Sequence, residues 1–121
     1  MRTAHTPHSS TTANSITGTG TITLQPATGS TTIGIGDSAT GTFDLDANEI
    51  AALTNGFSSI TIGRSDSTAL MTINADTFED PITFRMGGVS GDITTAGALV
   101  TSNLAMTFTA GTGDSGTFTQ S

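Results

Sequence analysis

The stretch Gly113-Asp114-Ser115-Gly116 matches the motif that surrounds the nucleophilic serine of many serine proteases. A serine nucleophile needs a histidine base and an orienting carboxylate within hydrogen-bonding distance. The two histidines, His5 and His8, both lie in the polar N-terminal stretch, at the opposite end of the sequence from this serine. We therefore interpret the motif as a turn and expect the protein not to be an enzyme, with no catalytic residue.

Candidate metal ligands are few in this sequence. His5 and His8 have no third ligand beside them and the chain has no cysteine, whereas zinc sites use three or four protein ligands. Aspartates at three turn-like places could bind calcium through their carboxylates, but the tandem glycine–aspartate repeat of calcium-binding β-rolls is absent. Asx-type turns are the interpretation that we favour for these residues, Asp37, Asp66 and Asp114. We expect no metal and no cofactor.

Charge and hydropathy exclude several classes of protein. The 121 residues include ten acidic and three basic side chains, which gives a net charge of -7, and only 11% of the residues are charged. Such a surface repels a phosphate backbone, so we expect no nucleic-acid partner. No apolar run approaches the roughly 20 residues of a spanning helix, so we expect no membrane span. The acidic pair Glu79-Asp80, which precedes Pro81, is interpreted as a solvated loop.

Short runs that alternate between apolar and polar residues begin after Ile16. Each places β-branched or aromatic side chains on one face and mostly threonine on the other, which is typical of half-buried strands. Gly, Asn, Asp and Ser between the runs indicate turns. The fold is therefore predicted to be all-β. The runs are Thr21–Leu24, Thr42–Leu45, Ser59–Ile62, Met71–Ile73, Pro81–Phe84 and Met106–Thr109.

Two sets of internal matches indicate a repeat of about 24 residues. The first set consists of short glycine-containing motifs around Gly34, Gly63, Gly87 and Gly111. The second set consists of runs that begin at Gly20, Gly41, Ala69, Gly91 and Gly116.

A repeat of this length, with several short strands, predicts a parallel β-helix (solenoid) of about four coils. Equivalent strands of successive coils would stack about 4.8 Å apart. Equivalent side chains would then form interior ladders, one of Phe43, Met71, Ile93 and Phe118, and another of Ile60, Ile82 and Met106.

The run after Leu45 predicts one short helix, near residues 47–53, that lengthens a coil. Asp46 is a suitable N-cap, and Glu49 follows three residues later as in a capping box. Ile50 and Leu53 share one face of such a helix. Asn55-Gly56 offers a left-handed stop.

Residues 1–15 differ in composition from the rest of the chain. They are rich in Ser and Thr and have almost no apolar residues, which predicts a disordered tail. Residues 16–121 then form the solenoid segment. No apolar core follows the N-terminal Arg2, so no signal peptide is visible.

Three segments of the chain resemble filamentous-haemagglutinin-like adhesins, which are very large bacterial proteins of the two-partner-secretion type. The segments are Ile16–Ala27, Leu45–Arg64 and Thr77–Phe84, and the resemblance extends over residues 15 to 119. It implies a right-handed parallel β-helix that serves as a shaft fragment of a secreted or cell-surface adhesin. It also implies that the partners are neighbouring coils of a longer shaft, other copies of the chain, and host or surface glycans. No binding residue carries over, because the matched segments are scaffold in that family.

Two functions from different classes follow. The first is a structural shaft segment in cell adhesion, without catalysis. The alternative is a ligand-binding solenoid that holds ice or a glycan on outward-facing threonine ladders. Thr-x-Thr pairs favour it, and Asp44 and Asn74 are expected to interrupt the ladders; the pairs are Thr21/Thr23, Thr107/Thr109 and Thr117/Thr119.

Overall fold

The computed structural model of the chain describes residues 15–101, 104–111 and 116–120. Within these ranges it has eleven strands and one short helix. Their bounds are β1 Thr21–Leu24, β2 Ile33–Ile35, β3 Phe43–Leu45, α1 Ala47–Ala51, β4 Ser59–Arg64, β5 Leu70–Ile73, β6 Asp76–Phe78, β7 Ile82–Met86, β8 Asp92–Thr95, β9 Leu99–Thr101, β10 Met106–Ala110 and β11 Phe118–Gln120. The predicted tail falls almost entirely on residues 1–14, which lie outside the described residues.

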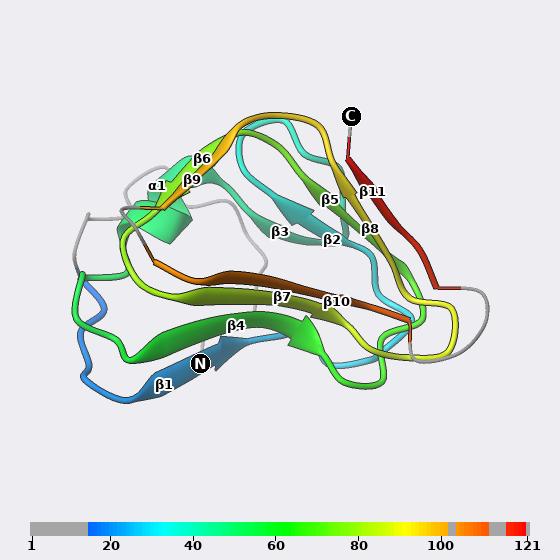
Figure 1. Cartoon of the computed structure of the whole chain (residues 1–121), viewed down its shortest axis with the longest axis horizontal. Coiled ribbons are helices and arrows are strands. Elements are labelled where there is room, and N and C mark those ends of the chain that lie inside the picture. Colours follow the sequence, from blue (N-terminus) through cyan, green and yellow to red (C-terminus); the bar gives the residue numbers. More distant parts are fainter. Residues whose placement is uncertain (1–14, 102–103, 112–115, 121) are drawn as a thin grey trace.

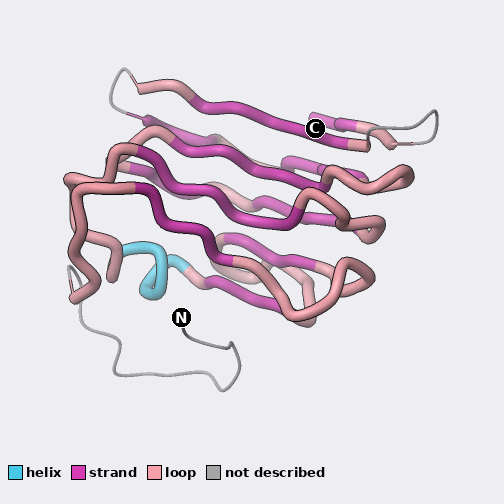
Figure 2. The backbone as a smooth tube through the Cα atoms, turned by 90° about the horizontal axis from the view of Figure 1, so that it is seen from below, coloured by secondary structure: helices cyan, strands magenta, loops and turns pink. Residues whose placement is uncertain are grey.

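The strands form three parallel sheets around one core (Figure 1). The four-stranded sheet has the order β1-β4-β7-β10, the five-stranded sheet β11-β8-β5-β2-β3, and the two-stranded sheet β6-β9. From β4 onwards the chain visits the four-stranded, five-stranded and two-stranded sheets in turn and then returns to the first. Successive passages lie in layers, with α1 in the first of them (Figure 2). The prediction of an all-β chain with one short helix is confirmed, and all the strand pairs are parallel.

The register of the four-stranded sheet confirms one predicted ladder. Ile60 pairs with Ile82, and Ile82 pairs with Met106. Ile22 of β1 extends the same row at the other end, opposite Ile60. The row is interior because Ile60 and Ile82 are both buried.

The second predicted ladder is partly wrong. Phe118, Ile93 and Met71 are neighbours in the five-stranded sheet, as expected. Ile33 of β2, however, lies between Met71 and Phe43, so these two residues do not pair directly. The sequence search missed β2 as a separate strand and therefore placed the wrong neighbour beside Met71.

The spacing of paired residues explains this error. In the four-stranded sheet the step along the chain from Ile22 to its partner Ile60 is much longer than the later step from Ile60 to Ile82. We call the part of the chain from β1 to α1 the first passage. It is long because it contains both β3 and α1. The alignment of Gly34 with Gly63 was wrong, since Gly34 lies in the five-stranded sheet and Gly63 in the four-stranded one.

The chain returns from β2 to the parallel strand β3 through a short loop. Gly36, with φ +89°, and Ser38, with φ 63°, adopt the backbone conformations that reverse its direction. The returning backbone then passes directly over β2, and a Cβ atom on Gly41 would lie 2.2 Å from the backbone nitrogen of Gly34. Two glycines therefore allow a contact that no larger residue at position 41 would permit.

Helix α1 has the predicted N-terminal cap. The Glu49 amide donates to Asp46 Oδ1 at 2.9 Å, and the Asp46 amide donates to Glu49 Oε2 at 3.3 Å. The helix is shorter than predicted, because it ends at Ala51 and its C-cap, Ala52, has right-handed backbone. The predicted stop at Gly56 was wrong: its φ of +139° serves a later loop, described below.

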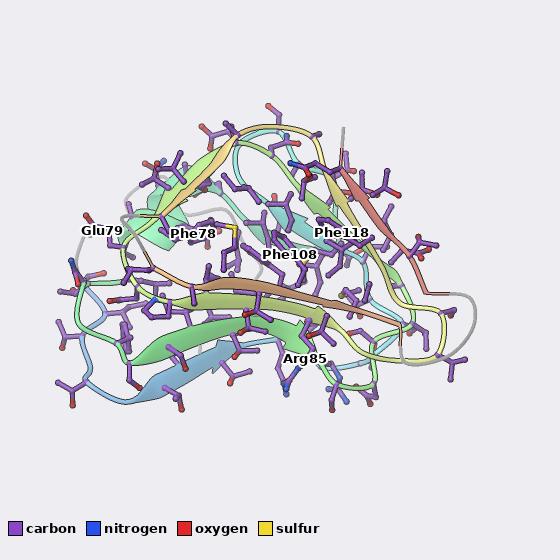
Figure 3. The ribbon with its side chains drawn as sticks, in the orientation of Figure 1. Phe78, Glu79, Arg85, Phe108 and Phe118 are labelled. Atoms are coloured by element: carbon purple, nitrogen blue, oxygen red, sulfur yellow. The ribbon has the colours of Figure 1, made fainter. Side chains whose placement is uncertain are left out.

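Apolar side chains from all three sheets fill the core, and four phenylalanines cross it in a chain of ring contacts. Phe84 lies edge-on to Phe78 at 5.4 Å between centroids and stacks on Phe108 at 5.3 Å. Phe108 contacts Phe118 at 4.6 Å. Figure 3 shows Phe78, Phe108 and Phe118 between the sheets and Arg85 on the outside. The rings tie successive layers together.

Candidate functional site

A row of four threonines lies on the outer face of the four-stranded sheet. Thr23 pairs with Thr61, Thr61 with Thr83, and Thr83 with Thr107, one from each strand of the sheet. Neighbouring strands are about 4.8 Å apart, so the hydroxyl groups repeat at that interval along the sheet. We call this row the threonine ladder.

The expectation that Asp44 and Asn74 interrupt such ladders holds for Asp44 alone, in the five-stranded sheet. Asn74 follows the end of β5, and its side-chain amide donates to the Asp37 carbonyl at 2.8 Å. In the five-stranded sheet Thr119, Thr94 and Thr72 are followed by Gly34 and then Asp44. The threonine ladder of the four-stranded sheet has no such interruption. It escaped the sequence search because the long first passage separates Thr23 from Thr61, so that the two threonines are not one repeat length apart.

The rows beside the threonine ladder are mixed in composition. On one side Thr21 pairs with Ser59, and on the other Gly63 pairs with Arg85, which pairs with Thr109. The Arg85 side chain points away from the core (Figure 3). Its Nε is buried and has no hydrogen-bond partner among the described residues. The outer face therefore presents hydroxyl groups and one guanidinium group, which suit a hydroxyl-rich or anionic ligand.

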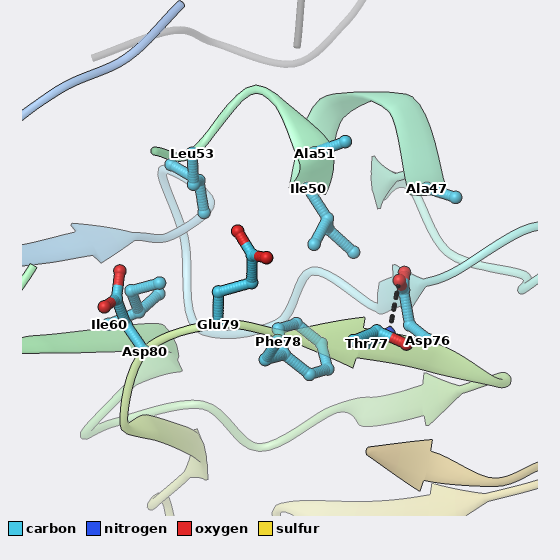
Figure 4. A pocket seen from close by; sticks show the side chains of 10 residues that line it. All are labelled: Ala47, Ile50, Ala51, Leu53, Ile60, Asp76, Thr77, Phe78, Glu79 and Asp80. Atoms are coloured by element: carbon cyan, nitrogen blue, oxygen red, sulfur yellow. Dashed lines mark hydrogen bonds between the residues drawn. The ribbon is translucent and has the colours of Figure 1, made fainter. Parts of the chain in front are cut away.

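A second candidate site is the cleft between α1 and β6 (Figure 4). It has a volume of about 320 Å³ and exists because α1, and not a strand, lies beside β6 in the first passage. Apolar side chains of α1 form one wall, and three acidic residues follow the other. The lining residues are Ala47, Ile50, Ala51, Leu53, Ile60, Asp76, Thr77, Phe78, Glu79 and Asp80.

The Asp76 side chain provides a hydrogen-bond acceptor for a backbone amide on the edge of β6 that faces this cleft. Its Oδ1 accepts from the Thr77 amide at 2.7 Å (Figure 4), whereas the Asp76 amide itself donates to Ala98 of the adjacent segment. Asp76 Oδ2 is buried without a hydrogen-bond partner among the described residues. Burial raises the pKa of Asp76, and the charges of Asp37 and Asp46 raise it further, against a lowering by the Thr77 amide. The neutral acid is therefore favoured more than in water.

The prediction that Glu79 and Asp80 are both solvated is wrong for Asp80. Glu79 is exposed, but Asp80 is only 5% exposed. Its carboxylate accepts from the Gly56 amide at 3.0 Å and from the Phe57 amide at 3.1 Å. Asp80 therefore fixes the loop after α1 to the following layer, and Gly56 supplies the positive φ that this loop needs. The sequence holds no local signal of this contact, because the partners belong to different layers and lie far apart along the chain.

The two turn aspartates in the described residues, Asp37 and Asp66, make other contacts than the local Asx turns that were expected. Asp37 Oδ1 accepts from the amide of Ala47, the first residue of α1, at 3.1 Å. Asp66 accepts from Arg64 through both carboxylate oxygens, at 2.6 and 2.8 Å. The Arg64 hydrogen bond lowers the pKa of Asp66, although a partial loss of hydration opposes this shift. Arg64 also donates to the carbonyl of Ala27 at 2.9 Å, which joins two layers.

Other predicted site residues cannot be placed. His5, His8, Asp114 and Ser115 lie outside the described residues. In the described part of the chain, no group of three or more His, Cys, Asp or Glu side chains could hold a metal ion. No helix in the described ranges could cross a bilayer, since α1 has five residues and a spanning helix needs about 20.

Comparison with known proteins gives no match: no family model, no curated protein and no solved structure is similar to this chain.

Proposed function

We propose that this chain is a right-handed parallel β-solenoid of about four coils and a structural shaft segment of a secreted or cell-surface bacterial adhesin. The observation that carries the proposal is the repeated order of the three parallel sheets. From β4 to β11 the chain passes through them in the same order, and paired strands follow one another at nearly equal steps along the chain. Stacked passages of this kind suit a stalk, because each contacts only its neighbours and further ones can be added.

The side chains also suit a scaffold more than a binding module. The core positions are filled by Ile, Phe and Met, and the cross-layer contacts of Asp80 and Arg64 are used within the fold. The partners that a shaft needs are further coils of the same kind. Glycan binding would belong to other parts of such an adhesin.

Location tests this proposal directly. A protease added to intact cells that express the protein should degrade it, while a cytosolic control protein stays intact. The purified chain should also show no binding on a glycan array. Complete protection of the chain in intact cells would overturn the surface location, and tight glycan binding by the purified chain would overturn a purely structural role.

A second function, binding of ice or a glycan, is favoured by the threonine ladder. Its four hydroxyl groups are aligned across one sheet without interruption. The double variant Thr61→Ala/Thr83→Ala removes the two central hydroxyls of the threonine ladder. The matched control, Thr72→Ala/Thr94→Ala, removes two paired threonines from the outer face of the five-stranded sheet.

Thermal hysteresis and the glycan array are the measurements for this second function. If the ladder binds, the first double variant should lose the signal and the control should keep it. Equal signals from both variants, or none from the unaltered chain, would exclude the threonine ladder as the binding site.

A further inference from the structure

The two ends of the stack differ in structure. At the end near the N-terminus, α1 lies where a strand of the two-stranded sheet would otherwise be, and the segment at Ile16 covers Leu53 through a parallel bridge. At the other end, which we call the tail end, each sheet finishes in a strand that is paired on its inner side and has no partner strand among the described residues on its outer edge. These strands are β9, β10 and β11.

Backbone N–H and C=O groups at the tail end point away from the stack, along the direction in which another strand could pair. The Ile82 amide donates to the Ala105 carbonyl, and the Ile93 amide donates to the Thr117 carbonyl. Along a strand, the backbone N–H and C=O groups of alternate residues point to opposite edges. The amides of Phe108 and Phe118 therefore point to the open edge. An open edge of this kind is a template for another strand.

Apolar side chains surround a hollow at the same end. The hollow has a volume of about 350 Å³ and receives residues from all three terminal strands, with no charged side chain in its lining. Phe118, which lines this hollow, is 45% exposed although it belongs to a strand. Burying it against a partner would remove apolar surface from water.

Charge favours the tail end over the opposite end for contact between identical chains. The strands β9, β10 and β11 contain no charged residue, whereas Asp37, Asp44, Asp46 and Glu49 lie in the first passage, around β3 and α1. Two copies of that acidic end would repel each other, because like charges at an interface are destabilising. The three tail-end strands themselves bring no like charges together.

The order of the terminal strands makes the tail end self-complementary. β9, β10 and β11 are consecutive along the chain, with β10 in the middle. A two-fold axis through the centre of the open edge of β10 pairs β10 with its own copy and exchanges β9 with β11. The axis also reverses the direction of the chain, so all three new pairs are antiparallel. β9 and β11 each have three residues and therefore match in length.

The side chains fit this pairing as well. β10 has five residues, and its centre is Phe108. Antiparallel pairing about Phe108 places the large Met106 opposite the small Ala110 of the partner, both on the inner face. In the other pair, Phe118 is opposite Thr101 and Thr119 is opposite Val100, so inner residues meet inner ones and outer residues meet outer ones.

We propose that the 121-residue chain forms a two-fold symmetric dimer through its tail end, with β10 pairing antiparallel to β10 and β9 to β11. The partner is a second copy of this chain. A dimer of this kind is closed, because it uses both tail ends and leaves the acidic ends outside. It stands on the open sheet edges of this 121-residue chain and not on the proposed surface location. In a longer shaft the next coil would cover the same edges, so a monomeric chain would leave the shaft proposal untouched.

Sedimentation equilibrium of the whole chain tests the dimer. We expect a monomer–dimer equilibrium with no larger species. In Thr107→Glu/Thr119→Glu, two exposed threonines on tail-end strands become acidic, which should raise the dissociation constant by at least about tenfold. The matched control, Thr21→Glu/Thr23→Glu, alters two exposed threonines of β1 at the opposite end and should change the constant less than about twofold. Far-UV circular dichroism confirms that both variants are folded.

Cross-linking gives the orientation, because the chain has no cysteine of its own. With a short bis-maleimide, Thr107→Cys should link to itself, and Thr23→Cys should not. Links between Thr107→Cys and Thr23→Cys in a mixture would indicate head-to-tail stacking and overturn the proposal. A monomer at all concentrations, or equal weakening by the two glutamate variants, would also overturn it.

Discussion

Replacing Phe84 by alanine probes the contact that joins the layers of the core. Phe84 has no exposed surface and contacts both Phe78 and Phe108. A buried phenylalanine removes about 150–250 Å² from water, which at about 25 cal/mol per Å² is roughly 4–6 kcal/mol as an upper estimate. Measured replacements of this type cost about 3–5 kcal/mol, and we expect that range here.

The loss of stability on replacing a phenylalanine by alanine should depend on its position in the stack. Phe118, at the tail end, is 45% exposed and buries little more than half of its side chain. Phe118→Ala should therefore cost about 2 kcal/mol. Thr83 precedes Phe84 in β7 but faces outward in the threonine ladder, so Thr83→Ala should cost less than about 1 kcal/mol.

Urea unfolding followed by far-UV circular dichroism is the assay, because the chain has no Trp or Tyr to serve as a fluorescence probe. The protein concentration should lie below that of dimerisation, so that Phe118 is not covered by a partner. If Phe84→Ala prevents folding, Phe84→Leu should still fold and lose about 1–2 kcal/mol. Equal losses for Phe84→Ala and Thr83→Ala, or a larger loss for Phe118→Ala than for Phe84→Ala, would refute the assignment of inner and outer faces.

Three further changes test individual contacts by thermal or urea unfolding. Asp80→Asn places an amide donor against backbone amides and should cost about 1–3 kcal/mol, whereas Glu79→Gln on the exposed neighbour should stay within about 0.5 kcal/mol; similar values for the two would argue against the buried carboxylate. The folded state raises the pKa of Asp76 above its ordinary 3.8 and so binds its proton more tightly than the unfolded chain, which means that stability is lost as the pH rises through the folded pKa. Asp76→Asn should therefore raise the melting temperature at neutral pH and not below the ordinary pKa, and a gain that is independent of pH would contradict this. Gly41→Ala should cost about 1–3 kcal/mol through overpacking, while Gly20→Ala, with no atom within 4 Å of its new Cβ, should be tolerated; equal effects would show that the return segment does not lie against β2.

Local patterns in the sequence predicted local structure well. The alternation of apolar and polar residues located strands such as β1, β4 and β7, and the capping box located the start of α1. β6 and β9 were missed because their sequences, Asp-Thr-Phe and Leu-Val-Thr, do not alternate between apolar and polar residues. Local rules also failed to give the end of α1, since the chain leaves the helix to meet Asp80 in the next layer.

Contacts between distant residues were predicted less well. The interior ladder of Ile60, Ile82 and Met106 followed from a regular spacing, and that spacing holds in the later layers. The first passage differs because β3 and α1 are inserted into it, and nothing in the sequence indicates how an insertion folds back. The threonine ladder and the buried Asp80 both depend on pairing across that passage or its loop, so neither was found.

The unequal number of strand ladders between layers has a mechanical consequence. Force applied between the two ends acts along the direction of the hydrogen bonds that join neighbouring strands. Between the middle layers three ladders share the load, β4 with β7, β5 with β8 and β6 with β9. The first junction has α1 where a third ladder would be, and the last has only β7 with β10 and β8 with β11 among the described strands. Under tension the structure should therefore yield by peeling from its ends, and its middle should be the last part to extend.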